Sequence, residues 1–257
     1  AEGGETKVMG ERMLHCYHSN RLEVLAEALA MVTDQPLSDP FGAEILVVQN
    51  PGMARWINQQ VAERIGVSAR LDYPLPAVFF WRLLQTWLPD APEPELFDRE
   101  ALLWRILRQL PRHLGDDAFA PLGRYLAGEG SDLRLFQLAR RVADLFDQYL
   151  VQRPEMVLGW EAGTDEQWQA RLWRALGAES GQVHRARLMA DLAAAMRQGP
   201  PTAGGLPERV CLFGLTALAP VYMDLLGLLA QHLPVHCFYL NPCREYWADL
   251  VDERGQA

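Results

Sequence analysis

Lysine is almost absent from this sequence. Among 257 residues the only lysine is Lys7, near the amino terminus, and the other cationic side chains are arginines. A phosphate-binding P-loop uses a lysine to reach the β- and γ-phosphates, so this chain is not expected to hydrolyse ATP by itself. The formal net charge of −9 argues against a protein that coats DNA non-specifically. A local groove of arginines is still possible, because guanidinium groups suit bidentate and stacking contacts.

Cysteines are few and lack metal-binding spacing. Cys16, Cys211, Cys237 and Cys243 include no CxxC pair, and three of them lie in or beside apolar runs, which favours reduced core thiols over zinc or disulfides. No apolar run reaches the roughly 18 residues of a membrane span. The amino terminus also lacks the apolar segment of a secretion signal. We therefore expect a cytoplasmic protein without membrane contacts.

The order of apolar patterns predicts an α/β domain with a parallel sheet. Apolar runs at residues 14–18, 45–48, 210–215 and 235–240 are typical of strands, and helical spacing follows the first three. Ser19 and Asn20 are expected to cap the first of these helices. The segment from Leu71 to Pro76 contains two prolines, so it is predicted to leave the sheet in an extended conformation.

Residues 78–198 show helical periodicity and no convincing strand. We predict a tag or disordered start at 1–12, the first part of the α/β domain at 13–77 and a helical insertion at 78–198. A linker at 199–207 and a return to the α/β domain at 208–257 complete the chain. An α/β domain interrupted by an all-α subdomain is a familiar helicase arrangement.

The stretch from Ile45 to Trp56 has the outline of a phosphate-binding loop without its key residues. A strand, a tight loop and a helix from Met53 follow one another, as in a P-loop. The loop, Asn50-Pro51-Gly52, has one glycine where the motif needs two, and no Lys-Ser or Lys-Thr follows. This degenerate P-loop is predicted to have another role or only to support the fold.

Asp144 and Asp147 are the most suggestive carboxylates. They lie three apart on one helix face, where two carboxylates can hold the metal of a nuclease. An ion pair from Arg140 accounts for Asp144 without a metal, and a carboxylate can also accept a hydrogen bond from a base amino group. His15 and His18 lie three apart in a strand and therefore face opposite sides. We expect no metal site.

Arginines interleave with aromatic residues along the chain, and two of them, Arg55 and Arg82, lie directly beside a tryptophan. Trp81 lies off the apolar stripe of its helix, so part of its ring is expected to be exposed. An exposed tryptophan can stack on a base, while arginines hold phosphates or recognise guanine. The arginines concerned are Arg55, Arg82, Arg153, Arg185 and Arg187. From composition alone, the simpler explanation is that these tryptophans pack in the core and these arginines are solvated.

Five long, ordered motifs are specific enough to point to a family. They are Tyr17–Leu22, Val48-Gln49 with Gly52–Ala54, Asp72–Ala77, Ala143–Val151 with Arg153-Pro154, and Asn241–Arg244. Together they closely resemble the N-terminal region of RecC, the gamma subunit of exodeoxyribonuclease V. The resemblance runs from about Met13 to Asp252, and chains of that family continue well beyond Ala257. The sequence therefore looks like an amino-terminal fragment.

The resemblance implies an inactivated superfamily 1 helicase-like (RecA-like) domain that has lost its ATP site. It also implies a non-catalytic subunit that works with RecB and RecD in bacterial double-strand break repair, in the cytoplasm at the nucleoid. Family members guide single-stranded DNA away from the duplex fork and recognise the Chi sequence. ATP and Mg are then expected in the partner subunits, and no cofactor is expected in this chain.

The resemblance also suggests DNA- and Chi-binding positions. Carried over residue by residue, they are Gln49, Leu75, Trp81, Asp144, Leu145, Asp147 and Arg153, with Arg185 as a looser match. Pro51 and Arg55 replace Thr-like and Gln-like residues of the best-known members, and Arg55 is kept as a candidate contact. Pro51 cannot donate a hydrogen bond and Arg55 adds a charge, so the recognised octamer is predicted to differ from the familiar one.

Two alternatives from other functional classes stay open. The first is an enzyme, either a degenerate ATPase that still binds nucleotide or a carboxylate nuclease. The second is a purely structural module that binds partners through the apolar helices of the insertion.

Overall fold

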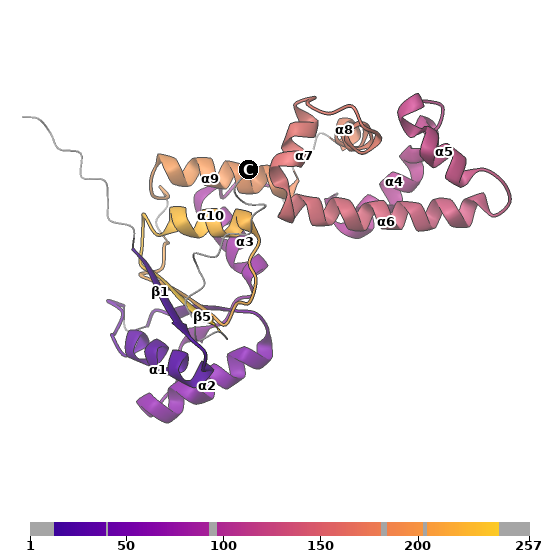
Figure 1. Cartoon of the computed structure of the whole chain (residues 1–257). Helices are drawn as coiled ribbons and strands as arrows, with labels where there is room; N and C mark the ends of the chain where they lie inside the picture. Colours follow the sequence, from indigo (N-terminus) through magenta and orange to yellow (C-terminus); the bar gives the residue numbers. More distant parts are fainter. Residues whose placement is uncertain (1–12, 40, 93–96, 181–183, 203–204, 242–257) are drawn as a thin grey trace, which may run out of the picture. The chain divides into compact units, whose positions relative to one another are not determined.

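The computed structural model describes residues 13–39, 41–92, 97–180, 184–202 and 205–241 (Figure 1). These residues form two compact units, which are described separately. The sheet unit contains the described residues up to Trp87, Met196–Leu218 and those from Tyr222 onward. The helical unit contains Leu88–Ala195 with Ala219–Val221. Lys7, Cys243 and the motif residues 242–244 lie outside the described ranges.

The sheet unit is built on five parallel strands in the order β1-β5-β4-β2-β3. The strands are β1 (Leu14–Ser19), β2 (Glu44–Val48), β3 (Leu71–Asp72), β4 (Val210–Phe213) and β5 (Val235–Leu240). Although more than 150 residues separate β2 from β4 in the chain, the two strands are neighbours, with Ile45 opposite Val210. The predicted α/β class with a parallel sheet is confirmed.

Helices cover both faces of this sheet. Figure 1 shows α1 (Leu22–Thr33) and α2 (Pro51–Ile65) on one face, and α3 (Pro76–Trp87) and α10 (Pro220–Leu229) on the other. On the α1 and α2 face, Leu46 and Val48 pack with Phe213 and Phe238 in one buried cluster. Val47, between them in β2, is also buried. A strand buried on both faces is expected to be continuously apolar, as β2 is from Ile45 to Val48.

Two predicted boundaries in the sheet unit were wrong. Leu71 and Asp72 do not leave the sheet but form its edge strand, β3, parallel to β2. The prolines of this segment, Pro74 and Pro76, follow the two strand residues, so they remove no N–H group from the strand. Helix α3 begins at Pro76. Ser19 belongs to β1 and its hydroxyl accepts a hydrogen bond from the Arg21 N–H. Helix α1 begins after it, at Leu22, without a side-chain cap.

The described cysteines are free thiols, as predicted. Cys16 is exposed, Cys237 is partly buried and Cys211 is buried. Burial raises the pKa of the Cys211 and Cys237 thiols to about 12, so both stay protonated and unreactive at neutral pH. His236 stacks on His15 across the β1–β5 pair, with ring centroids 4.8 Å apart. Burial, helped by the charge of His15, lowers the pKa of His236 to about 4, so this imidazole is neutral.

The helical unit contains no strand among its described residues. Its elements are α4 (Arg99–His113), the 3-10 turn η2 (Asp117–Phe119), α5 (Ala120–Leu126), α6 (Ser131–Gln152), α7 (Pro154–Glu161), α8 (Trp168–Ser180) and most of α9 (Arg185–Gln198). Its core includes Phe97, Phe146 and Trp173. The third predicted helix ends before Pro154, as expected. Helix α3 groups with the sheet, so the compact helical unit begins ten residues later than the predicted insertion.

No helix among the described residues is both long enough and apolar enough to span a membrane.

Candidate nucleic-acid interface

The connection between β2 and α2 is only two residues long. Val48 ends the strand and Pro51 begins the helix, so Gln49 and Asn50 alone join them. The prediction that Pro51 and Gly52 turn the chain in a loop was wrong, because both lie in the first helical turn. Proline suits this position, since its missing N–H would have no partner within the helix and its fixed φ matches the helix.

Asn50 closes the amino end of α2. Its side-chain Oδ1 accepts a hydrogen bond from the Met53 N–H at 2.9 Å, and its carbonyl accepts one from the Ala54 N–H at 3.3 Å. A Cβ at position 52 would lie 3.1 Å from Oδ1, so Gly52 allows the cap to approach. In a P-loop the amides of this turn bind phosphate. Here the Asn50 side chain occupies the Met53 N–H, the Ala54 N–H makes the first intrahelical bond, and Pro51 has no N–H to offer.

Gln49 lies at the carboxyl end of β2. It is exposed, and its amide Nε2 donates to the Thr216 hydroxyl, in the segment after β4, at 3.2 Å. Gly214, the residue after β4, has a φ of 65°, and a Cβ there would lie 3.2 Å from the Met53 methyl group. Gln49 directly follows the carboxyl end of β2, the edge at which ligands of open parallel sheets commonly bind.

Leu75 lies close to this strand end. The Val48 N–H donates to the Pro74 carbonyl at 3.2 Å, which ties the corner carrying Leu75 to the residue before Gln49. The Leu75 side chain is 41% exposed. Trp81, in the second turn of α3, is partly exposed, as its position off the apolar stripe predicts. Leu75, Trp81 and Gln49 are the candidate contacts that lie in the sheet unit.

Arg55 is exposed on α2, one turn after the Asn50 cap. Among the residues that the structure describes, no carboxylate lies within ion-pair distance of it. Its guanidinium group is therefore free to contact an anion near the amino end of the helix.

Asp144 is partly buried on α6 and does not pair with Arg140. The predicted ion pair within the helix was wrong, because the Asp144 carboxylate instead lies 2.8 Å from Nε of Arg99, the first residue of α4. This contact lacks hydrogen-bond geometry, and Oδ1 of Asp144 is buried without a hydrogen-bond donor. A buried oxygen that lacks a hydrogen-bond donor is costly, and the charge of Arg99 at 2.8 Å offsets part of that cost.

Asp147 and Arg185 are brought together in the helical unit. One guanidinium nitrogen of Arg185 lies 4.0 Å from Asp147, and another lies 4.0 Å from Asp98. Leu145, beside them on α6, is partly exposed. Arg153 follows the last residue of α6 and is exposed, with a φ of −141° and a ψ of 53°. The carboxyl-terminal half of α6 and the start of α9 thus collect the remaining predicted residues.

A polar cluster around the buried His184 fixes the start of α9, and no sequence pattern points to it. His184 is 2% exposed, its Nε2 contacts the Glu161 carboxylate, and its Nδ1 accepts a hydrogen bond from the Arg187 N–H at 3.3 Å. The Arg187 guanidinium group donates to the other Glu161 oxygen at 2.7 Å. Burial alone would raise the pKa of Glu161, but hydrogen bonds from His184, Arg187 and Trp173 outweigh it and lower that pKa. The cluster holds the helix turn that carries Arg185.

The described residues contain no group of three His, Cys, Asp or Glu side chains that could hold a metal ion. Asp144 and Asp147 therefore have no third ligand in the described part of the chain. The cation nearest to each of them is an arginine.

Comparison of the chain with known proteins identifies its family. The family "RecC, N-terminal domain" matches residues 14–257. The RecBCD enzyme subunit RecC of Escherichia coli K12 is 38% identical over 253 residues, which is 93% of this chain and 22% of the relative. The subunit of Haemophilus influenzae is 35% identical over 277 residues, which is 94% of this chain and 24% of the relative.

A more distant relative gives the same result. The RecBCD enzyme subunit RecC of Mycolicibacterium smegmatis is 31% identical over 254 residues, which is 94% of this chain and 22% of the relative. The chain thus spans roughly a quarter or less of the length of these relatives. The resemblance drawn from the sequence motifs is confirmed: the chain belongs to the RecC N-terminal domain family.

Proposed function

We propose that this chain is the amino-terminal part of a non-catalytic DNA-recognition and scaffold subunit of a RecBCD-type helicase and nuclease. In this role it guides single-stranded DNA away from the duplex fork and recognises a Chi sequence during recombinational repair of double-strand breaks. RecB-like and RecD-like subunits are its partners and supply ATP hydrolysis and Mg-dependent chemistry. Family membership and the names of the relatives support the assignment.

The observation that carries this proposal is the closed end of α2. A helicase motor needs a lysine and free amides at the strand-to-helix junction. Here Asn50 and Pro51 occupy that place. The sheet unit is then an inactivated superfamily 1 helicase-like domain (1A-like), and the helical unit is its insertion (1B-like).

The candidate residues have complementary roles in this proposal. The Gln49 amide contacts a base edge in place of Thr216, and Trp81 stacks on a base beside the apolar contact of Leu75. Asp144 and Asp147 accept hydrogen bonds from base amino groups, and Leu145 supports them. Arg55, Arg153 and Arg185 contact phosphates or guanine.

The proposal is tested by asking which single-stranded octamer changes the nuclease activity of the assembled enzyme. A library of octamers placed in linear duplex DNA is digested with the complex that contains this subunit, and protected fragments are sequenced. We expect one octamer to be enriched, and we expect it to differ from the familiar Chi because of Pro51 and Arg55. The double variant P51T/R55Q should shift the preference toward the familiar octamer. A library with no enriched octamer would refute recognition.

A further inference from the structure

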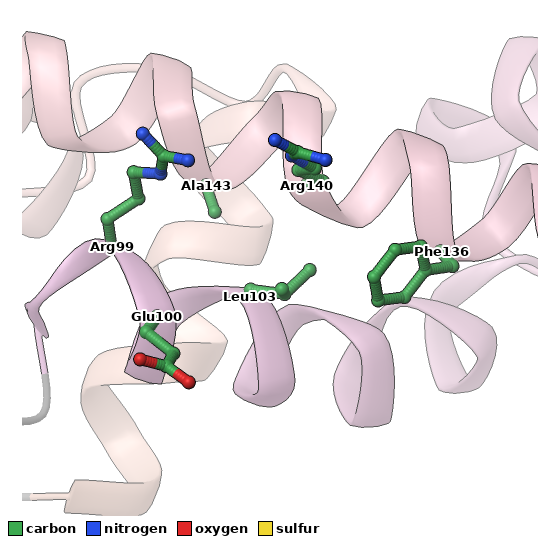
Figure 2. Close-up of a pocket in the computed structure, with 6 residues that line it drawn as sticks. All are labelled: Arg99, Glu100, Leu103, Phe136, Arg140 and Ala143. Atoms are coloured by element: carbon green, nitrogen blue, oxygen red, sulfur yellow. The ribbon is translucent and has the colours of Figure 1, made fainter.

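A groove lies between α4 and α6 of the helical unit, beside the candidate carboxylates. Its volume is about 400 Å³, within the range of about 300–1,000 Å³ typical of ligand pockets. Figure 2 shows the residues that line it, three of them apolar and three charged: Leu103, Phe136, Ala143, Arg99, Glu100 and Arg140.

One aromatic ring that lines this groove, Phe136, is paired with a second exposed ring, Trp104, on the neighbouring helix. Phe136 on α6 is 36% exposed and Trp104 on α4 is 56% exposed. Their ring centroids lie 6.3 Å apart with planes tilted by 55°. An aromatic pair left open to water is a stacking surface, since every nucleobase has a π-face that can lie against it.

The charges at the groove favour an anion. Arg140 is exposed, and among the described residues no carboxylate lies within ion-pair distance of it. Arg99 pairs with Asp144, with Nε 2.8 Å from Oδ1 of the carboxylate. In Figure 2 the Glu100 carboxylate extends away from both guanidinium groups. The aromatic surface therefore lies next to a cation that has no internal partner.

The groove continues the face of α6 that carries the candidate base contacts. Phe136, Arg140, Ala143 and Asp147 follow one another at spacings of four, three and four residues, so they share one side of the helix. Asp144 follows Arg140 by four residues and lies on the same side. A strand held at Asp144 and Asp147 can therefore run directly onto Arg140 and Phe136.

We propose that this groove binds single-stranded DNA independently of sequence, next to the recognised bases. One base stacks on Phe136, beside Trp104, and Arg140 contacts a neighbouring phosphate. The inference rests on the proposed function and extends its DNA track by one site. An aromatic surface beside an unpaired arginine is the combination that proteins use to bind unpaired strands.

The test uses the full-length subunit assembled with its partners and an oligothymidylate probe, which contains no recognition octamer. Arg140→Glu should weaken probe binding about tenfold. It should also reduce the slope of log affinity against log salt concentration by about one, as expected when one phosphate contact is lost. The control is Arg141→Glu, which makes the same charge change one residue further, about 100° around the helix. Arg141 is also exposed, and its replacement should leave the affinity almost unchanged.

The aromatic contact is tested separately. Phe136→Ala should weaken binding at least about fivefold, and Phe136→Tyr should restore it, because one stacked base contributes about 1–3 kcal/mol. Photochemical cross-linking of a probe containing 5-iodouracil should label Phe136 or Trp104.

Three results would overturn the inference. Equal losses from R140E and R141E would indicate general electrostatics, and unchanged probe affinity would remove the site. Weaker subunit assembly with unchanged probe affinity would assign the groove to a partner protein. Because the probe contains no octamer, these outcomes do not depend on whether the subunit recognises Chi.

Discussion

Replacing Trp81 by alanine is expected to abolish most of the response to the recognition octamer while leaving DNA unwinding nearly unchanged. The ring is partly exposed on α3, and stacking of one base contributes about 1–3 kcal/mol, which corresponds to at least about a fivefold loss of recognition. Asp147→Ala should act similarly, because the site loses a hydrogen-bond acceptor that distinguishes bases. In the proposed function the partner subunits drive unwinding, so loss of either side chain should leave it unchanged.

The measurement is the fraction of linear DNA protected at the octamer, with the unwinding rate recorded in the same assay. Asp132→Ala is the matched control for Asp147→Ala, since Asp132 is an exposed carboxylate in the first turn of the same helix. The control should behave like the unmodified enzyme. Equal losses of protection and unwinding in W81A and D147A would mean that these side chains only support the structure.

The second large effect is expected from Trp173→Ala. This side chain is 1% exposed, and its ring lies 5.3 Å from Phe97, 5.3 Å from Phe146 and 5.1 Å from His184, centroid to centroid. Its truncation should destabilise the helical unit by about 3–5 kcal/mol, because a large cavity remains. Octamer recognition should fall with it, since the same core holds Glu161 and His184 beneath the start of α9.

Urea unfolding of the purified chain, followed by circular dichroism, measures this loss. Trp173→Phe, which keeps most of the ring contacts, should lose less stability. Trp104→Ala is the exposed control and should change the free energy of unfolding by no more than about 0.5 kcal/mol. A Trp173→Ala variant as stable as Trp104→Ala would show that the ring cluster is not the core of this unit.

Much of the fold can be predicted from local sequence patterns, and the errors in that prediction have local causes. Continuous apolar runs marked β2 and β4, and helical periodicity marked the insertion between them. The connection after β2 was mispredicted because Pro51-Gly52 resembles a turn, while proline is equally suited to the first position of a helix. The edge strand β3 was missed because two residues with prolines nearby carry almost no strand signal, and only the neighbouring β2 makes them a strand.

The candidate interface was harder to predict from sequence, because its contacts join distant residues. Arg99 and Asp144 are 45 positions apart, and a local rule favoured Arg140, four residues away, as the partner. Similarly, His184 contacts Glu161 across 23 residues, a separation that matches no helical or strand spacing. The resemblance to RecC supplied positions such as Gln49 and Trp81, for which composition alone favoured a structural role.

The proposed function requires that the amino end of α2 binds no nucleotide. Nucleotide titration of the purified polypeptide tests this requirement most directly. A fluorescent ATP analogue with Mg is titrated into this chain without partner subunits, and ATP turnover is measured in parallel. We predict no saturable binding and no turnover, because Asn50 and Pro51 occupy the phosphate position and no lysine follows. Saturable binding that ATP displaces, accompanied by hydrolysis, would contradict the account and identify the chain as a motor.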